Sequence, residues 1–157
     1  MTPTTVPAPP LTFFAHLSVR VAAPYDLGEA PDGHRRLVPL TGGSFEGPEV
    51  RGTVLPGGAD HQVLRTATLT ELDARYALET DRGERIAVHN TGIRSGRPED
   101  IAALVRGEEV APERIHFRSH PRLTTAAGRL AWLNERLFVA TGERRPDSVE
   151  LDVFLLG

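Results

Sequence analysis

The chain contains no cysteine, and all 18 of its basic residues are arginine, so lysine is absent too. The lack of cysteine excludes disulfides, thiolate catalysis and cysteine-based zinc sites, and it fits a reducing cytoplasm, which is the compartment we expect. The lack of lysine excludes Schiff-base chemistry and the lysine of a phosphate-binding P-loop. Arginines remain, and they are suited to bidentate binding of carboxylates.

Long apolar runs and a charge excess are missing as well. No segment approaches the roughly 18 apolar residues of a membrane span, and residues 1–10 have neither the charged nor the apolar region of a signal peptide. The net charge of −3 gives no electrostatic reason to expect nucleic acid or a membrane surface as a partner. We therefore expect one domain over residues 11–157, behind a disordered tail of residues 1–10.

The sequence does contain many short segments in which apolar and polar residues alternate, as in half-buried strands. Leu11–Val21 and residues 70–80 show this pattern most clearly. In the second segment one face carries Leu72, Ala74, Tyr76 and Leu78. Further strands are predicted at residues 34–40, 50–55, 62–67, 85–90, 115–119, 136–141 and 149–156.

Helical signals are few. Pro98 begins a segment with acidic residues in its first turn and an apolar face spaced by three and four, which Gly107 ends. A shorter helical turn is predicted at Gly128–Glu135. The predicted fold is therefore all-β: a closed antiparallel β-barrel of about eight to ten strands, resembling a lipocalin, with one or two short helices.

Two Gly-Gly pairs, Gly42-Gly43 and Gly57-Gly58, predict a specific backbone path, since glycine permits positive φ and close backbone approach. Asp60 follows the second pair and either caps backbone N–H groups of the turn or serves as a catalytic or ligand-binding carboxylate. His61 titrates near neutrality and is either solvent-exposed or an acid–base group. Neighbours on a strand point to opposite faces, so Asp60 and His61 should not orient one another.

Arg75 lies in the middle of the segment 70–80, on the face that also carries Asp73 and two glutamates. If that face is outside, its charges form a solvated ladder that contributes little to stability. If it lines the interior, Arg75 and Asp73 form a buried pair suited to holding a carboxylate or enolate oxygen. Arg75 is a candidate catalytic residue with both orientations open.

Other candidates lie near predicted turns or have polar groups on aromatic rings. Asn90 and Arg118 are catalytic candidates, although Asn90 also fits a simple turn and Arg118 also fits a structural ion pair. Candidate ligand-binding residues are Glu46, His61, Tyr76, Arg94 and Trp132. Tyr76 and Trp132 equally suit a core position.

The six histidines form no recognisable metal motif. His116 and His120 are four residues apart, which suits a helix, but on a predicted strand they would lie about 13 Å apart. A site assembled from distant residues, as in cupin-like barrels, is the alternative. We expect neither a metal nor a cofactor.

Several short motifs together resemble the bacterial and fungal family known as domain of unknown function 3237. They are Gly42-Gly43 with Gly47-Pro48, Leu55-Pro56-Gly57-Gly58-Ala59-Asp60, Asp73-Ala74-Arg75-Tyr76, Asp81 with Gly83, Asn90 with Gly92, Phe117-Arg118, Trp132-Leu133-Asn134, and Val139 with Gly142. The resemblance spans nearly the whole chain and implies a compact β-barrel similar to small-molecule-binding barrels. The chain departs from the family at His61, where an aromatic residue is usual; if that position lines the pocket, a titratable group replaces an apolar wall.

These observations lead to a functional hypothesis. We expect a homodimeric, cofactor-independent enzyme that performs isomerase- or cyclase-type proton transfer on a small, partly apolar, oxygenated metabolite in a specialised biosynthetic pathway. Asp60 or His61 would move the proton, and Arg75, Asn90 and Arg118 would hold the developing oxyanion. The alternative is a non-catalytic ligand-binding barrel, which needs only apolar walls and an orienting contact.

Overall fold

The computed structural model describes residue 2 and residues 5–157, so part of the predicted N-terminal tail lies outside the described residues. The described chain forms ten strands: β1 (Leu11–Val21), β2 (Tyr25–Ala30), β3 (Gly33–Glu46), β4 (Arg51–Val54), β5 (Gly58–Thr66), β6 (Leu69–Thr80), β7 (Arg85–Ser95), β8 (His116–Thr125), β9 (Phe138–Arg144) and β10 (Ser148–Leu156). One α-helix, α1 (Pro98–Val105), and two 3₁₀ segments, η1 (Pro112–Arg114) and η2 (Gly128–Glu135), complete it.

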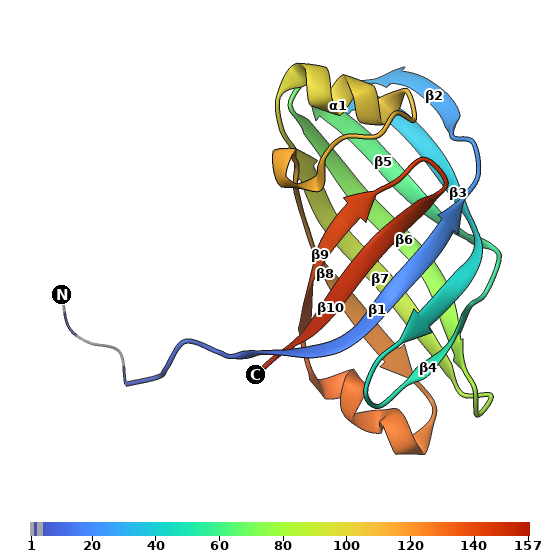
Figure 1. Ribbon diagram of the computed structural model, residues 1–157, viewed down its shortest axis with the longest axis vertical. Helices are drawn as coiled ribbons and strands as arrows, with labels where there is room; N and C mark the ends of the chain where they lie inside the picture. Colours follow the sequence, from blue (N-terminus) through green and yellow to red (C-terminus); the bar gives the residue numbers. More distant parts are fainter. Residues whose placement is uncertain (1, 3–4) are drawn as a thin grey trace.

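The strands close into an antiparallel barrel, as the sequence predicts (Figure 1). Pairing runs from β1 through β10, β9, β8, β7 and β6 to β4 and β3, and β1 also pairs with β3, which completes the circle. Both β4 and β5 pair with β3 on one side and β6 on the other, so together they fill one position. The barrel wall therefore has eight strand positions. β2 is not one of them and pairs with the first part of β3 at the edge of the sheet.

Successive side chains of a strand point alternately into and out of the barrel. A local β-bulge shifts this alternation by one residue. In β6 the side chains of Leu72, Tyr76 and Leu78 share one face, as predicted, and are buried, whereas Arg75 on the other face is exposed. In β1 a register shift between Phe13 and Ala15 leaves Phe13 outside, with 42% of its surface exposed. A bulge inserts one residue and therefore moves every later side chain to the other face.

The two ends of the barrel differ (Figure 1). At one end, η2 covers an apolar core into which Leu130 and Leu133 insert, both almost fully buried. At the other end, α1 lies beside β2, with Ile101 and Leu104 buried beneath it. The inward positions near this second end carry polar and charged side chains, so the polar interior lies between α1 and the apolar core.

Two regions differ from the sequence-based expectation. The predicted turn-rich connection before residue 34 contains β2, whose alternation is interrupted by a register shift at Gly28 and whose side chains are mostly exposed. The strand predicted at residues 34–40 continues through the first glycine pair to Glu46. Gly42 and Gly43 have φ values of +141° and +140°, and an added Cβ on Gly43 would lie 2.0 Å from the Ser18 carbonyl oxygen. This glycine pair therefore lets β1 and β3 meet, rather than forming a turn.

The predicted helices are present. Pro98 opens α1, and Gly107 follows the helix with a φ of +80°. The shorter helical turn is the 3₁₀ segment η2. Among the described residues no helix is both long and apolar enough to cross a bilayer.

Candidate functional site

A small cavity with apolar and polar walls lies inside the barrel, between the α1 end and the apolar core. Its volume is about 40 Å³, which in this measure is room for about three water molecules. Inward-facing side chains of β1, β3, β5 to β8 and β10 form its wall: Val19, Leu40, Asp60, Leu72, Ala74, Tyr76, Asn90, Arg94, Phe117, Val149 and Leu151. The residues from β1, β3 and β10 are apolar, whereas β5 to β7 contribute the polar groups together with Leu72 and Ala74.

Asp60 is the carboxylate of this cavity. Its Oδ1 accepts a hydrogen bond from the backbone N–H of Asp73 at 3.0 Å, and its Oδ2 accepts one from Gln62 Nε2 at 2.9 Å. β5 and β6 pair at Asp60 and Ala74, and the pairing continues at Val63 and Glu71. The Asp73 N–H lies between these two pairs and donates to the Asp60 carboxylate. Asp60 therefore links β5 to β6 and does not cap the Gly57-Gly58 turn.

Arg94 contributes a buried cation. Only 5% of its surface is exposed, and its Cζ atom lies 5.4 Å from the centre of the Phe117 ring, within the range of a cation–π contact. Burial lowers the pKa of Arg94 to about 10; the negative charge of Asp60 acts in the opposite direction, and Arg144 and Arg36 lower it further. Arg94 is therefore charged at neutral pH, although its surroundings disfavour the charge.

Two further cavity residues have polar atoms without a partner. The Tyr76 hydroxyl and Asn90 Oδ1 are buried and find no hydrogen-bonding partner within the described part of the chain. Burial and then the negative charge of Asp60 raise the pKa of Tyr76, so its hydroxyl keeps its proton. Buried polar groups in folded proteins are nearly always hydrogen bonded to protein or to ordered water, so these two groups mark where water or a polar ligand would bind in the cavity.

Arg36 and Arg144 extend the positive charge toward the mouth of the barrel. Arg36 faces inward from β3 and also lines an outer groove beside β2 and α1. Arg144 donates to the carbonyl oxygens of Pro146 at 3.1 Å and Ser148 at 3.4 Å, in the β9–β10 connection. Burial is the largest influence on both guanidinium groups and lowers the pKa of each.

Four of the nine candidate residues named from the sequence therefore line one cavity: Asp60, Tyr76, Asn90 and Arg94. Arg75 and Arg118 do not, because both side chains face outward. Asp73, the expected buried partner of Arg75, instead hydrogen bonds to His89 Nε2 at 2.8 Å on the outer face. The idea of an interior Arg75–Asp73 pair is wrong, because Tyr76 holds the inward position and its neighbour must point out.

The other three candidates also lie away from the cavity. Glu46 and His61 are exposed on the outer face, so His61 does not line the interior. Trp132 lies in η2 at the opposite end, where its ring meets Phe14 edge-on with centroids 5.8 Å apart. It belongs to the packing that closes the apolar end.

The alternation in the sequence also contains signals for inward-facing polar residues near the cavity that were not candidates. Arg36 shares the inward face of β3 with Val38 and Leu40, and this spacing of two marks it as an inward arginine. Gln62 shares a face with Asp60 by the same rule and is buried. Arg144 gave no usable signal, because the strand predicted in this region stops at residue 141.

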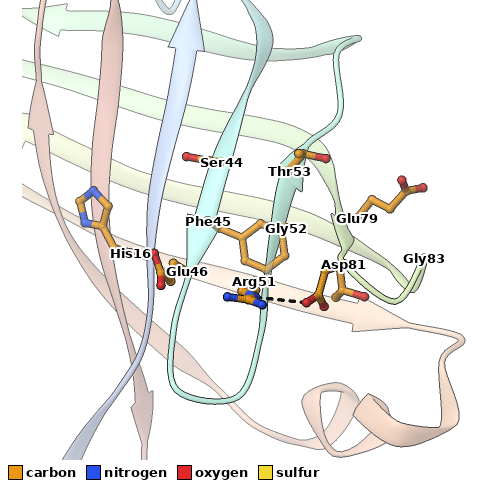
Figure 2. Close-up of a pocket in the computed structure, with 11 residues that line it drawn as sticks. His16, Ser44, Phe45, Glu46, Arg51, Gly52, Thr53, Glu79, Asp81 and Gly83 are labelled. Carbon is orange, nitrogen blue, oxygen red and sulfur yellow. Dashed lines mark hydrogen bonds and ion pairs between the residues drawn. The ribbon is translucent and has the colours of Figure 1, made fainter.

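A larger hollow exists on the outer face of β1, β3, β4 and β6 (Figure 2). It has a volume of about 990 Å³ and is open to solvent. Arg51 forms an ion pair with Asp81 at 3.1 Å, as Figure 2 shows. His16 is hydrogen bonded to Asp152 and Glu150, which do not line the groove. None of the buried polar atoms without partners lies on this groove. The interior cavity is therefore the better candidate site, despite its smaller volume.

No group of three or more histidine or acidic side chains among the described residues is arranged to hold a metal ion. The polar groups of the candidate site are one carboxylate, one phenol, one amide and one guanidinium group. Such groups can move a proton and hold an oxyanion.

The chain matches the family described as "Protein of unknown function (DUF3237)" over residues 9–156. The UPF0311 protein RPA1785 of Rhodopseudomonas palustris is 42% identical over 137 residues, which is 87% of this chain and 90% of the relative. Its crystal structure, titled as a conserved protein of unknown function, aligns over the full length of both chains with a TM-score of 0.90.

Two further solved structures share the fold. A beta-barrel like protein from Acinetobacter baumannii has a TM-score of 0.86 at 34% identity and covers 98% of this chain and 99% of its own. An enzyme from Penicillium herquei has a TM-score of 0.74 at 19% identity, and the alignment covers 99% of this chain and 100% of the enzyme. This similarity concerns the fold alone. The match over nearly the whole length and the relatives above 30% identity show that the chain belongs to the DUF3237 family of proteins of unknown function.

Proposed function

We propose that the protein is a cofactor-independent enzyme that binds a small oxygenated metabolite inside the barrel and transfers a proton within it. One observation carries this proposal: a carboxylate, a buried cation and two polar groups without partners surround a single cavity. The Penicillium herquei neighbour is described as an enzyme, which adds support from the fold.

In the proposed reaction, Asp60 removes a proton from a carbon next to a carbonyl group. The Arg94 guanidinium and the neutral Tyr76 hydroxyl hold the enolate oxygen that forms, because fixed donors in a water-poor site stabilise such a charge most effectively. The proton returns from Asp60 to another atom of the same molecule. If no new bond forms, the net change is an isomerisation. If the enolate carbon first attacks an electrophilic carbon–carbon double bond of the same molecule, the new bond closes a ring and the proton goes to the carbon that receives the displaced electron pair. Neither reaction needs an oxidant or a reductant.

The cavity is small, at about 40 Å³. A metabolite exceeds this volume, so binding requires side chains at the mouth to move. Arg36 is the best placed to do so, since it faces both the interior and the outer groove beside α1.

The Asp60→Asn variant tests the proposal. Asparagine keeps the shape, and its amide can accept from the Asp73 N–H while donating to Gln62 Oε1, which has no partner in the described structure. Wild type, Asp60→Asn and the outer-face control Asp73→Asn are incubated in D₂O with a panel of small ketones, enones and hydroxy acids.

We expect wild type and Asp73→Asn to incorporate deuterium into one class of compound and Asp60→Asn to do so at least about 100-fold more slowly. Thermal stabilisation by that compound should persist in Asp60→Asn. If a compound stabilises all three proteins but none exchanges a proton, the barrel is a binding protein without catalytic activity, which is the alternative function.

A further inference from the structure

Three guanidinium groups face inward on the described strands, those of Arg36, Arg94 and Arg144. Asp26 acts on Arg36 and Asp147 acts on Arg144, so each of these two cations has a carboxylate nearby in addition to Asp60. For Arg94, Asp60 is the acidic group that favours its charge. Both oxygens of the Asp60 carboxylate already accept hydrogen bonds from Gln62 and from the Asp73 backbone.

Arg94 is the one of these three cations that lines the cavity itself. Within the described part of the chain, its guanidinium group makes no hydrogen bond or ion pair. It lies over the ring of Phe117 in a cation–π contact. Arg144, by contrast, is bound by backbone carbonyl groups. A charge that is buried without a partner costs stability, and an anion placed against it relieves that cost.

The remaining groups define where such an anion would lie. The unpartnered Tyr76 hydroxyl faces the same cavity as Arg94 and can donate a second hydrogen bond. Leu40, Leu72 and Leu151 form apolar wall around them. A site with two donors among apolar walls suits an organic molecule with one charged oxygen group.

We propose that the ligand of the interior cavity is an organic monoanion whose oxyanion lies between Arg94 and Tyr76. This inference rests on the proposed function and narrows its substrate class to carboxylates and the conjugate bases of acidic enols or phenols. Neutral ligands of the same shape bind more weakly, because they leave Arg94 uncompensated.

Small probe pairs test this preference. Acetate and acetamide have the same shape and differ in charge, and acetate is small enough for the cavity. Each is titrated at constant ionic strength while the side-chain NMR signals of Asn90 and Arg94 are followed. A second probe, 4-nitrophenol, reports on phenolates, because preferential binding of its anion lowers its apparent pKa and raises its visible absorbance.

Four proteins are compared: wild type, Arg94→Gln, Arg94→Lys and the outer-face control Arg118→Gln. We expect at least one anion to bind wild type and Arg118→Gln saturably, at least tenfold more tightly than its neutral counterpart. Arg94→Gln should lose this preference, and Arg94→Lys, which keeps the charge, should retain part of it. Circular dichroism establishes that each variant is folded.

The probe that responds identifies the source of the oxyanion, acetate for carboxylates and 4-nitrophenol for phenols or enols. The inference is overturned if neither anion binds more tightly than its neutral counterpart, or if Arg94→Gln keeps the preference. If the inference is overturned in this way but neutral probes bind, the proposed function is not contradicted. If no probe of either charge binds, and the metabolite panel gives no exchange, both proposals fail.

Discussion

The guanidinium group of Arg94 is buried, and within the described part of the chain it has no polar partner. Its pKa, lowered to about 10 by burial, shows that the folded protein disfavours the charge. Replacing a buried charge by an apolar side chain of similar length often stabilises a protein. Residues arranged for a ligand commonly reduce stability in this way.

We therefore expect Arg94→Met to raise the free energy of unfolding by about 1–3 kcal/mol while abolishing anion binding. Urea denaturation measures the first effect and the probe titration the second. The exposed control Arg118→Met should change stability by no more than about 0.5 kcal/mol. A loss of stability in Arg94→Met would contradict the view that this charge awaits a ligand.

His16 on the outer face offers a residue-scale test with pH. Its Nδ1 lies 2.7 Å from Asp152 Oδ1 and its Nε2 lies 3.1 Å from Glu150 Oε1, and only the protonated ring can donate to both. The hydrogen bond to Asp152 is the main cause of a raised His16 pKa; burial opposes it, and Glu150 adds to it. A raised pKa stabilises the fold below the unfolded value of 6.5, and this stabilisation disappears as pH rises through the folded pKa.

Wild type should consequently be more stable than His16→Gln at pH 5.5, and the difference should vanish by pH 9. Thermal unfolding at several pH values measures it, and an NMR titration of the ring gives the pKa directly. An equal difference at both pH values would show that His16 contributes through packing instead of charge.

At the scale of elements, the pairing of β1 with β3 closes the barrel, and Gly43 makes that contact possible. Its φ is +140°, and a Cβ would lie 2.0 Å from the Ser18 carbonyl oxygen. Gly128, at the start of η2, is the opposite case, because an added Cβ there meets nothing within 4 Å.

Gly43→Ala should accordingly lower the free energy of unfolding by at least about 3 kcal/mol, since both the backbone angle and the space forbid a side chain. Gly128→Ala should change it by no more than about 0.5 kcal/mol. Urea denaturation of the two variants beside wild type decides the matter. Equal stability of all three would refute the close approach of β1 and β3.

The strands show how far the sequence leads at this scale. Alternation located β1 and β6 almost to the residue, and it placed Tyr76 and Leu78 on the apolar face, which lies inward. It missed β2, because a bulge at Gly28 and exposure of most of its side chains remove the pattern. It ended β3 too early, because a glycine pair inside an extended strand looks like a turn in the sequence.

At the scale of the whole molecule, the barrel brings together residues that no local pattern connects. Asp60, Tyr76, Asn90 and Arg94 were each candidates, and they share one cavity because they come from three neighbouring strands in register. Arg75 was named as a candidate with both orientations open, and the structure places it on the outer face. The expected homodimer, like the expected cytoplasmic location, remains a prediction.

The apolar core extends from the η2 end to the walls of the cavity, and the buried polar groups lie toward the α1 end. The η2 end supplies packing, so the α1 end can hold polar groups that lack partners among the described residues. The account's central claim is that a ligand fills this polar end and not the larger groove on the outside.

The most direct test is a crystal structure of the wild-type protein with the compound that stabilises it most in the metabolite panel. We predict that the compound lies inside the barrel, with an oxygen atom within hydrogen-bonding distance of both Arg94 and Tyr76 and with its reacting atom near Asp60. A compound found instead in the groove between β1, β3, β4 and β6, with the interior unchanged, would contradict the proposed site.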